Sequence, residues 1–233
     1  MKLTYFWVDF FTVIIPFIFS FHPKINFKKK FKFFFPANIL VASLFIIWDI
    51  SFTKKGVWGF NPDYVSGIYF FNLPIEEILF FICIPFSCVF TYHSINLFFN
   101  IRSKPKTEVL FVNALATVLI VTGIYFYSRM YTSYTFISLS LLLLFMKYMA
   151  KVDWLPKLAM VYLFLLIPFL IVNGILTGFG LAQPVVWYNN AENIGIRLLT
   201  IPVEDIFYGF ELILLNVTLY EYFKKYFHRY ESD

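Results

Sequence analysis

Seven apolar runs dominate this chain, and most of its charged residues lie in the connections between them. The runs cover about residues 5–21, 33–52, 75–98, 109–127, 134–149, 154–177 and 198–223. An α-helix of roughly 20 apolar residues crosses a bilayer, and we expect each run to be long enough to do so. The sequence therefore predicts an all-α polytopic membrane protein with seven transmembrane helices.

Composition supports this interpretation and excludes several classes of protein. The chain has 233 residues, of which 60% are hydrophobic and 14% charged, whereas soluble domains are about 25% charged. Seven spans would use about 140 residues, which leaves no room for a soluble catalytic domain. The nearest approach to a nucleotide-binding glycine motif is Gly178-Phe179-Gly180, and Gln183 stands where its third glycine is needed. We therefore expect no cofactor and no metal.

The positions of the cations predict the orientation in the membrane. Fourteen of the 19 Lys and Arg residues lie in the odd-numbered connections and the C-terminal tail, and five lie before the first run or in the even-numbered connections. Cytoplasmic loops carry the excess of Lys and Arg. We expect the N-terminus outside the cell (inner) membrane and the C-terminus in the cytoplasm. The net charge of +5 then reflects contact with membrane lipid and not with nucleic acid.

Two segments resemble one another at a fixed separation of 128 residues. Pro74-Ile75-Glu76-Glu77-Ile78 matches Pro202-Val203-Glu204-Asp205-Ile206, and similar loops precede them, Trp58-Gly59-Phe60-Asn61 and Trp187-Tyr188-Asn189-Asn190. Both segments open helices that run in the same direction. We predict a parallel repeat, with residues 1–106 and 131–233 as its halves and a linker helix within residues 107–130. Functional sites in such folds usually lie at the interface between the repeats.

The repeated acids are the candidate catalytic residues: Glu76, Glu77, Glu204 and Asp205. Proline followed by acids is also ordinary chemistry for the first turn of a helix. The motif occurs twice in one register, and residues 76–98 contain no Lys or Arg. Both observations favour a functional role for the acids over simple helix capping. An apolar cavity disfavours the charged form of a carboxyl, so one member of each pair could act as a general acid. Neighbours on a helix point about 100° apart, so only one member can face a cavity, and the other could accept a proton.

Other residues near the acids could shape or tune a substrate pocket. They are Pro74, Pro202, Asp49, Asn173, Phe80, Phe81, Phe207, Tyr208, Trp58, Trp187, Asn61 and Asn190. Aromatic ring faces stabilise cations, and an acid with an aromatic wall suits carbocation chemistry. Asp49 and Asn173 could instead form hydrogen bonds between helices, and the two tryptophans could belong to an interfacial aromatic belt or act as a lid. Three further polar residues, Asp9, His93 and Glu211, have no counterpart in the repeat, and we expect structural roles for Asp9 and His93.

At these residues the sequence resembles the integral-membrane lycopene cyclases, in which two small homologous subunits, or their fused form, each carry a Pro-x-Glu-Glu or Pro-x-Glu-Asp motif. The resemblance extends over essentially the whole chain, including residues 21–27, and the chain resembles the fused form. It implies an isomerase that cyclises the ends of lycopene to β-ionone rings, through γ-carotene to β-carotene, without a redox cofactor. The matching acids are Glu76, Glu77, Glu204 and Asp205. The substrates would come from the lipid phase, with other carotenoid-pathway enzymes as partners.

Other functions fit the same general features. Seven spans with an outer N-terminus also suit a receptor, although residues 198–223 contain no lysine for a retinal Schiff base. Parallel repeats with buried acids also suit a proton-coupled transporter. Within the cyclase class, formation of an ε-ring, or of one ring only, would use the same residues. The sequence leaves these alternatives open.

Overall fold

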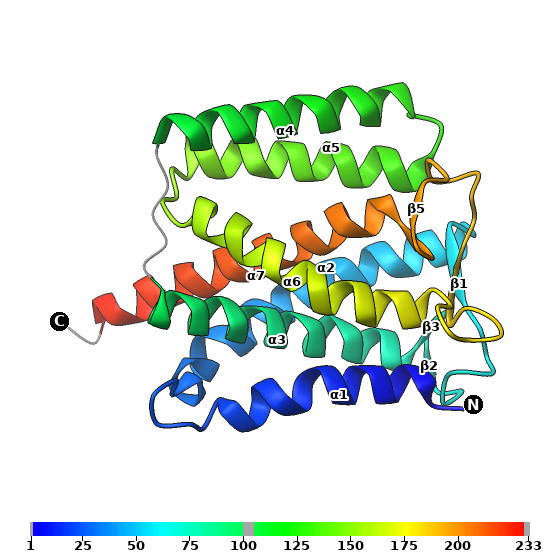
Figure 1. Cartoon of the computed structure of the whole chain (residues 1–233), viewed down its shortest axis with the longest axis horizontal. Coiled ribbons are helices and arrows are strands. Elements are labelled where there is room, and N and C mark those ends of the chain that lie inside the picture. The colour runs from blue at the N-terminus through cyan, green and yellow to red at the C-terminus, as the bar shows by residue number, and fades with distance from the viewer. Residues whose placement is uncertain (1, 100–104, 231–233) are drawn as a thin grey trace.

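The chain folds into a bundle of helices in the computed structural model, which describes residues 2–99 and 105–230 (Figure 1). The helices are α1 (Thr4–Phe19), α2 (Phe31–Lys54), α3 (Ile75–Phe98), α4 (Pro105–Tyr125), α5 (Met130–Leu144), α6 (Leu155–Leu176) and α7 (Val203–Tyr230). A 3-10 turn at Phe27–Lys30 leads into α2, and a π-helix at Phe145–Met149 continues α5. The N-terminal end of α1 and the C-terminal end of α7 lie at opposite ends of the bundle.

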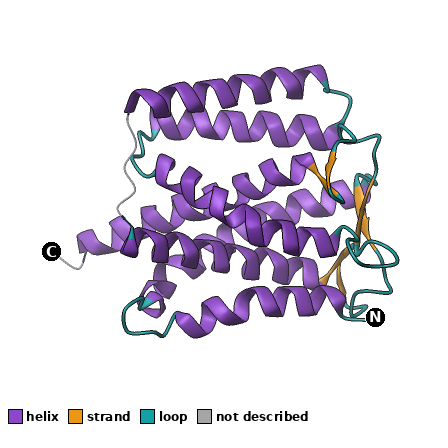
Figure 2. Cartoon of the chain, viewed as in Figure 1, coloured by secondary structure: helices purple, strands orange, loops and turns teal. Residues whose placement is uncertain are grey.

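Short strands gather at one end of the bundle, beside the start of α1 (Figure 2). They are β1 (Trp58–Phe60), β2 (Tyr69–Phe70), β3 (Leu73–Pro74), β4 (Val186–Tyr188), β5 (Arg197–Leu198) and β6 (Ile201–Pro202). They form antiparallel pairs, β1 with β4, β2 with β3 and β5 with β6. The β1–β4 pair joins the loop before α3 to the loop before α7, so it ties the two parts of the chain together over one end of the bundle.

Among the described residues, five helical segments are long and apolar enough to cross a membrane. They are Phe27–Lys54, Ile75–Phe98, Glu108–Tyr125, Met130–Met149 and Leu155–Leu176. Helix α1 is apolar but has 16 residues. Helix α7 carries Glu204, Asp205 and Glu211 in its first half, and all three side chains are buried. These three acids therefore face the interior of the bundle, where their cost at membrane depth is lowest.

The predicted helical runs match the observed helices to within about four residues, except at the two ends of the last one, which continues to Tyr230 and not to residue 223. Helix α3 has the predicted bounds, whereas α7 begins at Val203 and not at residue 198. The prediction of helix over residues 198–202 is wrong, because this stretch belongs to the β5–β6 hairpin. Leu198 pairs with Ile201 in that hairpin, and Pro202 is its last strand residue. Sequence patterns did not predict the strands either, since the longest has three residues.

The hairpins before α3 and α7 have the same backbone geometry at a separation of 128 residues. Tyr69 pairs with Pro74 in one, and Arg197 pairs with Pro202 in the other. Each turn contains a bulky residue in the left-handed region, Phe71 with φ 54° and Leu199 with φ 59°. Each helix therefore starts from the same turn, and the two acid pairs occupy the same positions in their helices.

Packing among the helices is uneven. Helix α1 packs mainly on α3, α2 packs on α7 and α3, and α4 packs mainly on α5. The largest buried cluster has members from every helix from α2 to α7, with Phe34, Phe86 and Leu158 among them. An ion pair of 2.6 Å between Lys147 Nζ and Glu108 Oε1 joins the far end of α5 to α4. Helix α6 contacts α1 and α7 sparsely, and this loose packing leaves space beside it.

Candidate active site

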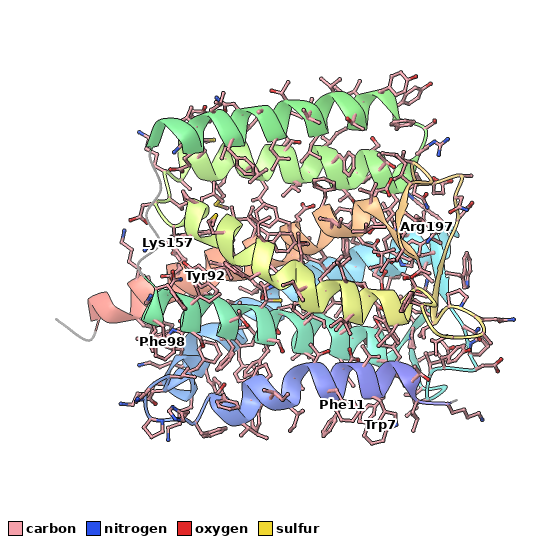
Figure 3. All side chains as sticks on the ribbon, viewed as in Figure 1. Trp7, Phe11, Tyr92, Phe98, Lys157 and Arg197 are labelled. Carbon is pink, nitrogen blue, oxygen red and sulfur yellow. The ribbon has the colours of Figure 1, made fainter. Side chains whose placement is uncertain are left out.

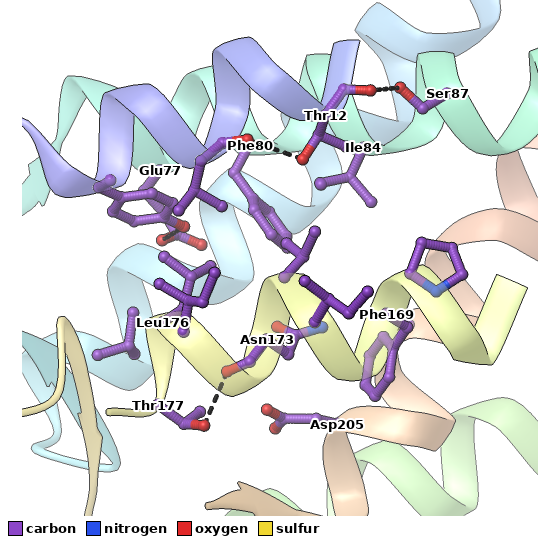
Figure 4. A pocket seen from close by; sticks show the side chains of 18 of the residues that line it. Thr12, Glu77, Phe80, Ile84, Ser87, Phe169, Asn173, Leu176, Thr177 and Asp205 are labelled. Atoms are coloured by element: carbon purple, nitrogen blue, oxygen red, sulfur yellow. Dashed lines mark hydrogen bonds between the residues drawn. The ribbon is translucent and has the colours of Figure 1, made fainter. Parts of the chain in front are cut away.

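A cavity of about 980 Å³ lies between α1, α3, α6 and α7, and its wall is mostly apolar (Figure 4). It begins near the strands and follows one face of α3 from Glu77 to Thr91, a rise of about 21 Å along the helix axis. Phe80 and Ile84 of α3 and Phe169 of α6 contribute to the wall. The space is therefore long and suits an extended apolar molecule.

Each acid pair contributes one carboxyl group to the wall of this cavity. Glu77 comes from the first turn of α3 and Asp205 from the first turn of α7, and both side chains are buried. The hydroxyl of Tyr5 donates a hydrogen bond of 2.5 Å to Glu77 Oε2. The hydroxyls of Tyr131 and Tyr188 donate to Asp205 Oδ1 and Oδ2, at 2.6 and 3.0 Å. Phenol groups thus hold both acids in place.

The other acid of each pair turns away from the cavity and binds the loop before its helix. Glu76 Oε1 accepts a hydrogen bond of 2.7 Å from the backbone N–H of Ser66. Glu204 Oε1 accepts one of 2.7 Å from the backbone N–H of Ile194, and a second of 2.5 Å from the Thr132 hydroxyl. Both partner N–H groups lie ten residues before their acid. Each pair therefore gives one acid to the cavity and one to the loop.

The cavity opens sideways between α1 and α6. Trp7 and Phe11 of α1 line it, yet 48% and 64% of their surfaces are exposed. Ile15 and, on α6, Ile171 also line the cavity and are exposed. Trp7 and Phe11 lie on the outer edge of the bundle, away from α3 (Figure 3). The opening therefore faces the direction in which lipid would surround the helices.

Asp49 of α2 and Trp58 of β1 complete the wall near Glu77. Both line the cavity, and the Trp58 indole N–H donates a hydrogen bond to Asp49 Oδ1. Asn173 of α6 also lines the cavity, and its backbone carbonyl accepts a hydrogen bond of 2.7 Å from the Thr177 hydroxyl. Asp49 and Asn173 thus reach the same cavity from different helices.

Two aromatic residues follow each acid pair, and in each case one lines the cavity and the other does not. Phe80 and Tyr208 line the cavity, and the Tyr208 ring lies 6.2 Å from the Trp58 ring. Phe81 and Phe207 lie outside it, where Phe81 packs on Phe45 and Phe207 packs on Phe136. One ring per acid pair therefore faces the carboxyl groups.

The remaining sequence candidates lie around the cavity and not in its wall. Pro74 and Pro202 are buried at the ends of β3 and β6, directly before the helices. Asn61 Nδ2 donates to Gln183 Oε1 at 3.1 Å, and Asn190 Oδ1 accepts from Arg197 Nη2 at 2.8 Å. Trp187 covers Gly59 of the paired strand, where a Cβ atom would overlap the indole ring.

The three polar residues without a counterpart in the repeat lie outside the cavity. Glu211 of α7 accepts a hydrogen bond of 2.9 Å from the Ser138 hydroxyl of α5. His93 Nε2 lies 3.1 Å from the backbone carbonyl of Ile25, in the loop between α1 and α2. Asp9 of α1 is buried. None of the three is part of the cavity wall.

Comparison with known families adds to this geometry. The model of the lycopene cyclase family matches residues 2–95 and again residues 128–223, which together make up most of the chain. The chain belongs to the lycopene cyclase family. Each matched segment contains one hairpin and one acid pair, and Glu77 and Asp205 come from different segments. No match appears among the curated proteins or among the solved structures. Family and apolar helices together indicate an integral membrane protein of carotenoid cyclisation with carotenoid substrates.

Sequence reasoning missed the phenols that bind the acids of this cyclase. Tyr5 and Tyr131 lie at the starts of α1 and α5, each beside a threonine, in the pairs Thr4-Tyr5 and Tyr131-Thr132. The order of the two residues is reversed, so the tyrosines do not share a repeat position, and no motif in the sequence marks them. Tyr188 lies in β4, and desolvation together with the Asp205 carboxyl raises its pKa well above the usual 10. Tyr188 is therefore a neutral phenol that donates its proton to the hydrogen bond.

Proposed function

We propose that the chain is a lycopene β-cyclase, an isomerase that closes the ends of lycopene to β-ionone rings. The observation that carries the proposal is the meeting of Glu77 and Asp205, from two matched segments, in one aromatic-lined cavity. Acid and base groups with an apolar wall are the equipment for adding one proton to a hydrocarbon and removing another. The reaction changes no oxidation state.

Ring closure follows from this arrangement. A carboxyl group adds a proton to C2 of the terminal double bond, which places a tertiary cation at C1. The C5–C6 double bond attacks C1, the ring closes, and the positive charge moves to C5. A carboxylate then removes the proton from C6. The ring faces of Phe80, Tyr208 and Trp58 stabilise the positive charge, and the apolar wall keeps out water that would trap the cation.

The substrate enters from the membrane. Lycopene and γ-carotene dissolve in lipid, and the exposed apolar residues Trp7, Phe11 and Ile15 line the sideways opening of the cavity. One end of the polyene passes between α1 and α6 and reaches the acids near the strands. γ-Carotene, which has one ring, re-enters by the same route for the second cyclisation.

The proposal includes the seven-span arrangement. Helices α1–α3 and α5–α7 form a parallel repeat, and α4 is the linker. The end of the bundle that carries the strands lies on the outer side of the inner membrane. The matching hairpins before α3 and α7 support the repeat. Lys157 lies near the end opposite the strands, where the excess of cations belongs on the cytoplasmic side, and Arg197 lies at the strand end (Figure 3).

Expression in a bacterium that accumulates lycopene tests the function. The pigments extracted from the cells should change from lycopene to β-carotene, with γ-carotene as the intermediate. Products with ε-rings would identify a cyclase that forms the other ring type. γ-Carotene as the only product would identify a cyclase that closes one end of lycopene and not both. Unchanged lycopene, with the protein present in the membrane fraction, would contradict the proposal. The double variant Glu77→Gln/Asp205→Asn should abolish ring formation, whereas Glu211→Gln, which alters an acid outside the cavity, should not.

A further inference from the structure

The two carboxyl groups that the acid pairs place in the cavity, Glu77 and Asp205, differ in their hydrogen bonds. Asp205 accepts a phenol on each of its oxygens, from Tyr131 on Oδ1 and from Tyr188 on Oδ2. Phenols are much weaker acids than carboxyl groups, so the phenols are the donors, and donors on both oxygens stabilise the carboxylate. Glu77 accepts one phenol, from Tyr5 on Oε2. No hydrogen bond is found for its Oε1 among the described residues, so this oxygen can carry a proton into the cavity.

Neighbouring charges distinguish the same two groups. Asp49 interacts electrostatically with Glu77, and both side chains are buried in the cavity wall. Two carboxylates so placed in an apolar cavity do not both ionise readily, so this pair retains a proton. Glu204 is the acid beside Asp205, but its Oε1 is held outside the cavity by Thr132 and Ile194.

We propose that Glu77 gives the proton to the substrate and that Asp205 removes the proton from the same ring. The inference rests on the proposed cyclase function and adds a division of roles within it. Each half of the chain supplies one step, so both halves act on every ring. The alternative, in which each half cyclises one end of lycopene on its own, does not explain why the two acids face one cavity with different hydrogen-bond partners.

The steps balance without any co-reactant. The O–H bond of the Glu77 carboxyl breaks as the C2–H bond of the substrate forms. The electron pair of the C5–C6 double bond makes the C1–C6 bond, and the electron pair of the C6–H bond then restores the C5–C6 double bond. Asp205 takes that proton. After one ring Glu77 is ionised and Asp205 is protonated, and proton exchange with water restores both groups before the next ring.

Single variants in heavy water separate the two roles. Membranes containing the protein are incubated with lycopene, and both the rings formed and the lycopene recovered are analysed by mass spectrometry. Asp205→Asn should form few β-rings yet introduce deuterium into the recovered lycopene, because the first proton transfer still occurs and reverses. Glu77→Gln should leave lycopene without deuterium. Glu211→Gln should match the unchanged protein, and failure of the unchanged protein itself to cyclise lycopene would refute the function and not the division of roles.

The reverse pattern would overturn the proposal. Deuterium in lycopene recovered from Glu77→Gln, but not from Asp205→Asn, would exchange the two roles. Retention of γ-carotene formation by either single variant would show that each half works alone. Loss of deuterium uptake in Asp49→Asn, together with its retention in Glu77→Gln, would make Asp49 the donor.

Tyr188→Phe gives a second test that does not remove a carboxyl group. Tyr188 is a positioning residue for Asp205, and loss of its hydrogen bond should slow β-ring formation about tenfold. The ratio of deuterated lycopene to ring product should rise, because the second step alone is weakened. Tyr5→Phe, the matched change at Glu77, should not raise this ratio. An equal ratio in the two variants would contradict the division of roles.

Discussion

Adjacent acids in this protein occupy different surroundings because neighbouring side chains leave a helix about 100° apart. Glu204 is surrounded by protein and accepts hydrogen bonds from a backbone N–H and a hydroxyl group, while Asp205 lies in the cavity wall. Glu76 and Glu77 divide in the same way. At the scale of the residue, the first acid of each pair supports the loop, and the second is available to a substrate.

Thr132→Val tests the supporting role of Glu204. The change removes a hydroxyl that donates a hydrogen bond of 2.5 Å to a buried carboxyl, and it should lower the free energy of unfolding by about 1–3 kcal/mol. Thermal unfolding in detergent micelles measures the effect. The folded fraction should still cyclise lycopene, with the same proportion of rings. A variant of normal stability without activity would instead place Glu204 among the reacting groups.

Tyr208 tests the role of ring faces in the cavity. Tyr208→Phe keeps the ring and should retain most of the activity, whereas Tyr208→Leu should lower the initial rate of ring formation about tenfold, as expected for loss of a cation–π contact. The measurement is the rate of γ-carotene formation in membranes supplied with lycopene. Equal losses in the two variants would show that the hydroxyl of Tyr208, and not its ring, takes part.

Residues were predictable from the sequence where they repeat and not where they interact over long distances. Glu77 and Asp205 recur in one motif, so their positions stood out. Tyr5 and Tyr131 bind acids 72 and 74 residues away, and such contacts leave no local pattern. Trp58 and Trp187 look equivalent in sequence, but Trp58 and Tyr188 are the residues that face the cavity.

The hairpins before α3 and α7 are the elements that orient the acids. Gly195 has φ 82° and Gly67 has φ 87° at the same separation of 128 residues, a conformation that a side chain destabilises by about 1–2 kcal/mol. Gly195→Ala should therefore destabilise the protein by about that amount and lower cyclisation, because Gly195 directly follows Ile194, whose N–H binds Glu204 in the loop that leads into the hairpin.

Gly174→Ala is the matched control for this prediction. Gly174 lies inside α6, where a Cβ atom would meet Phe179 Cβ at an ordinary 3.7 Å. Alanine favours helix over glycine by about 1 kcal/mol, so this variant should be as stable as the original chain or more so. Unfolding temperatures of the two variants in detergent provide the comparison. Equal behaviour would show that the left-handed turn contributes nothing to stability.

Elements were predictable from hydropathy when they were long. The apolar runs located all the described helices, because about 20 residues of uniform character outweigh any local signal. The strands were not predicted, because segments of two or three residues are too short to show an alternating pattern of apolar and polar residues. The start of α7 was misplaced because the apolar run continues through the hairpin that contains Leu198 and Ile201.

At the scale of the whole molecule, the strand end and the α1–α2 connection should lie on opposite sides of the membrane. Ala182→Cys and Lys24→Cys place single thiols at exposed positions at these two ends, in a chain whose native Cys83 and Cys88 are replaced by alanine. A maleimide that cannot cross membranes should label the first variant in intact cells and the second only after permeabilisation. The opposite labelling pattern would invert the proposed orientation.

The central claim is that carboxyl groups of one cavity add a proton to a hydrocarbon and remove another, with no net change in composition. The most direct measurement is the mass of β-carotene formed from lycopene in heavy water by membranes containing the unaltered protein. One deuterium per ring, located at C2, is the predicted result. Rings formed without deuterium would contradict the account, because the proton added to the substrate would then not come from a group that exchanges with water.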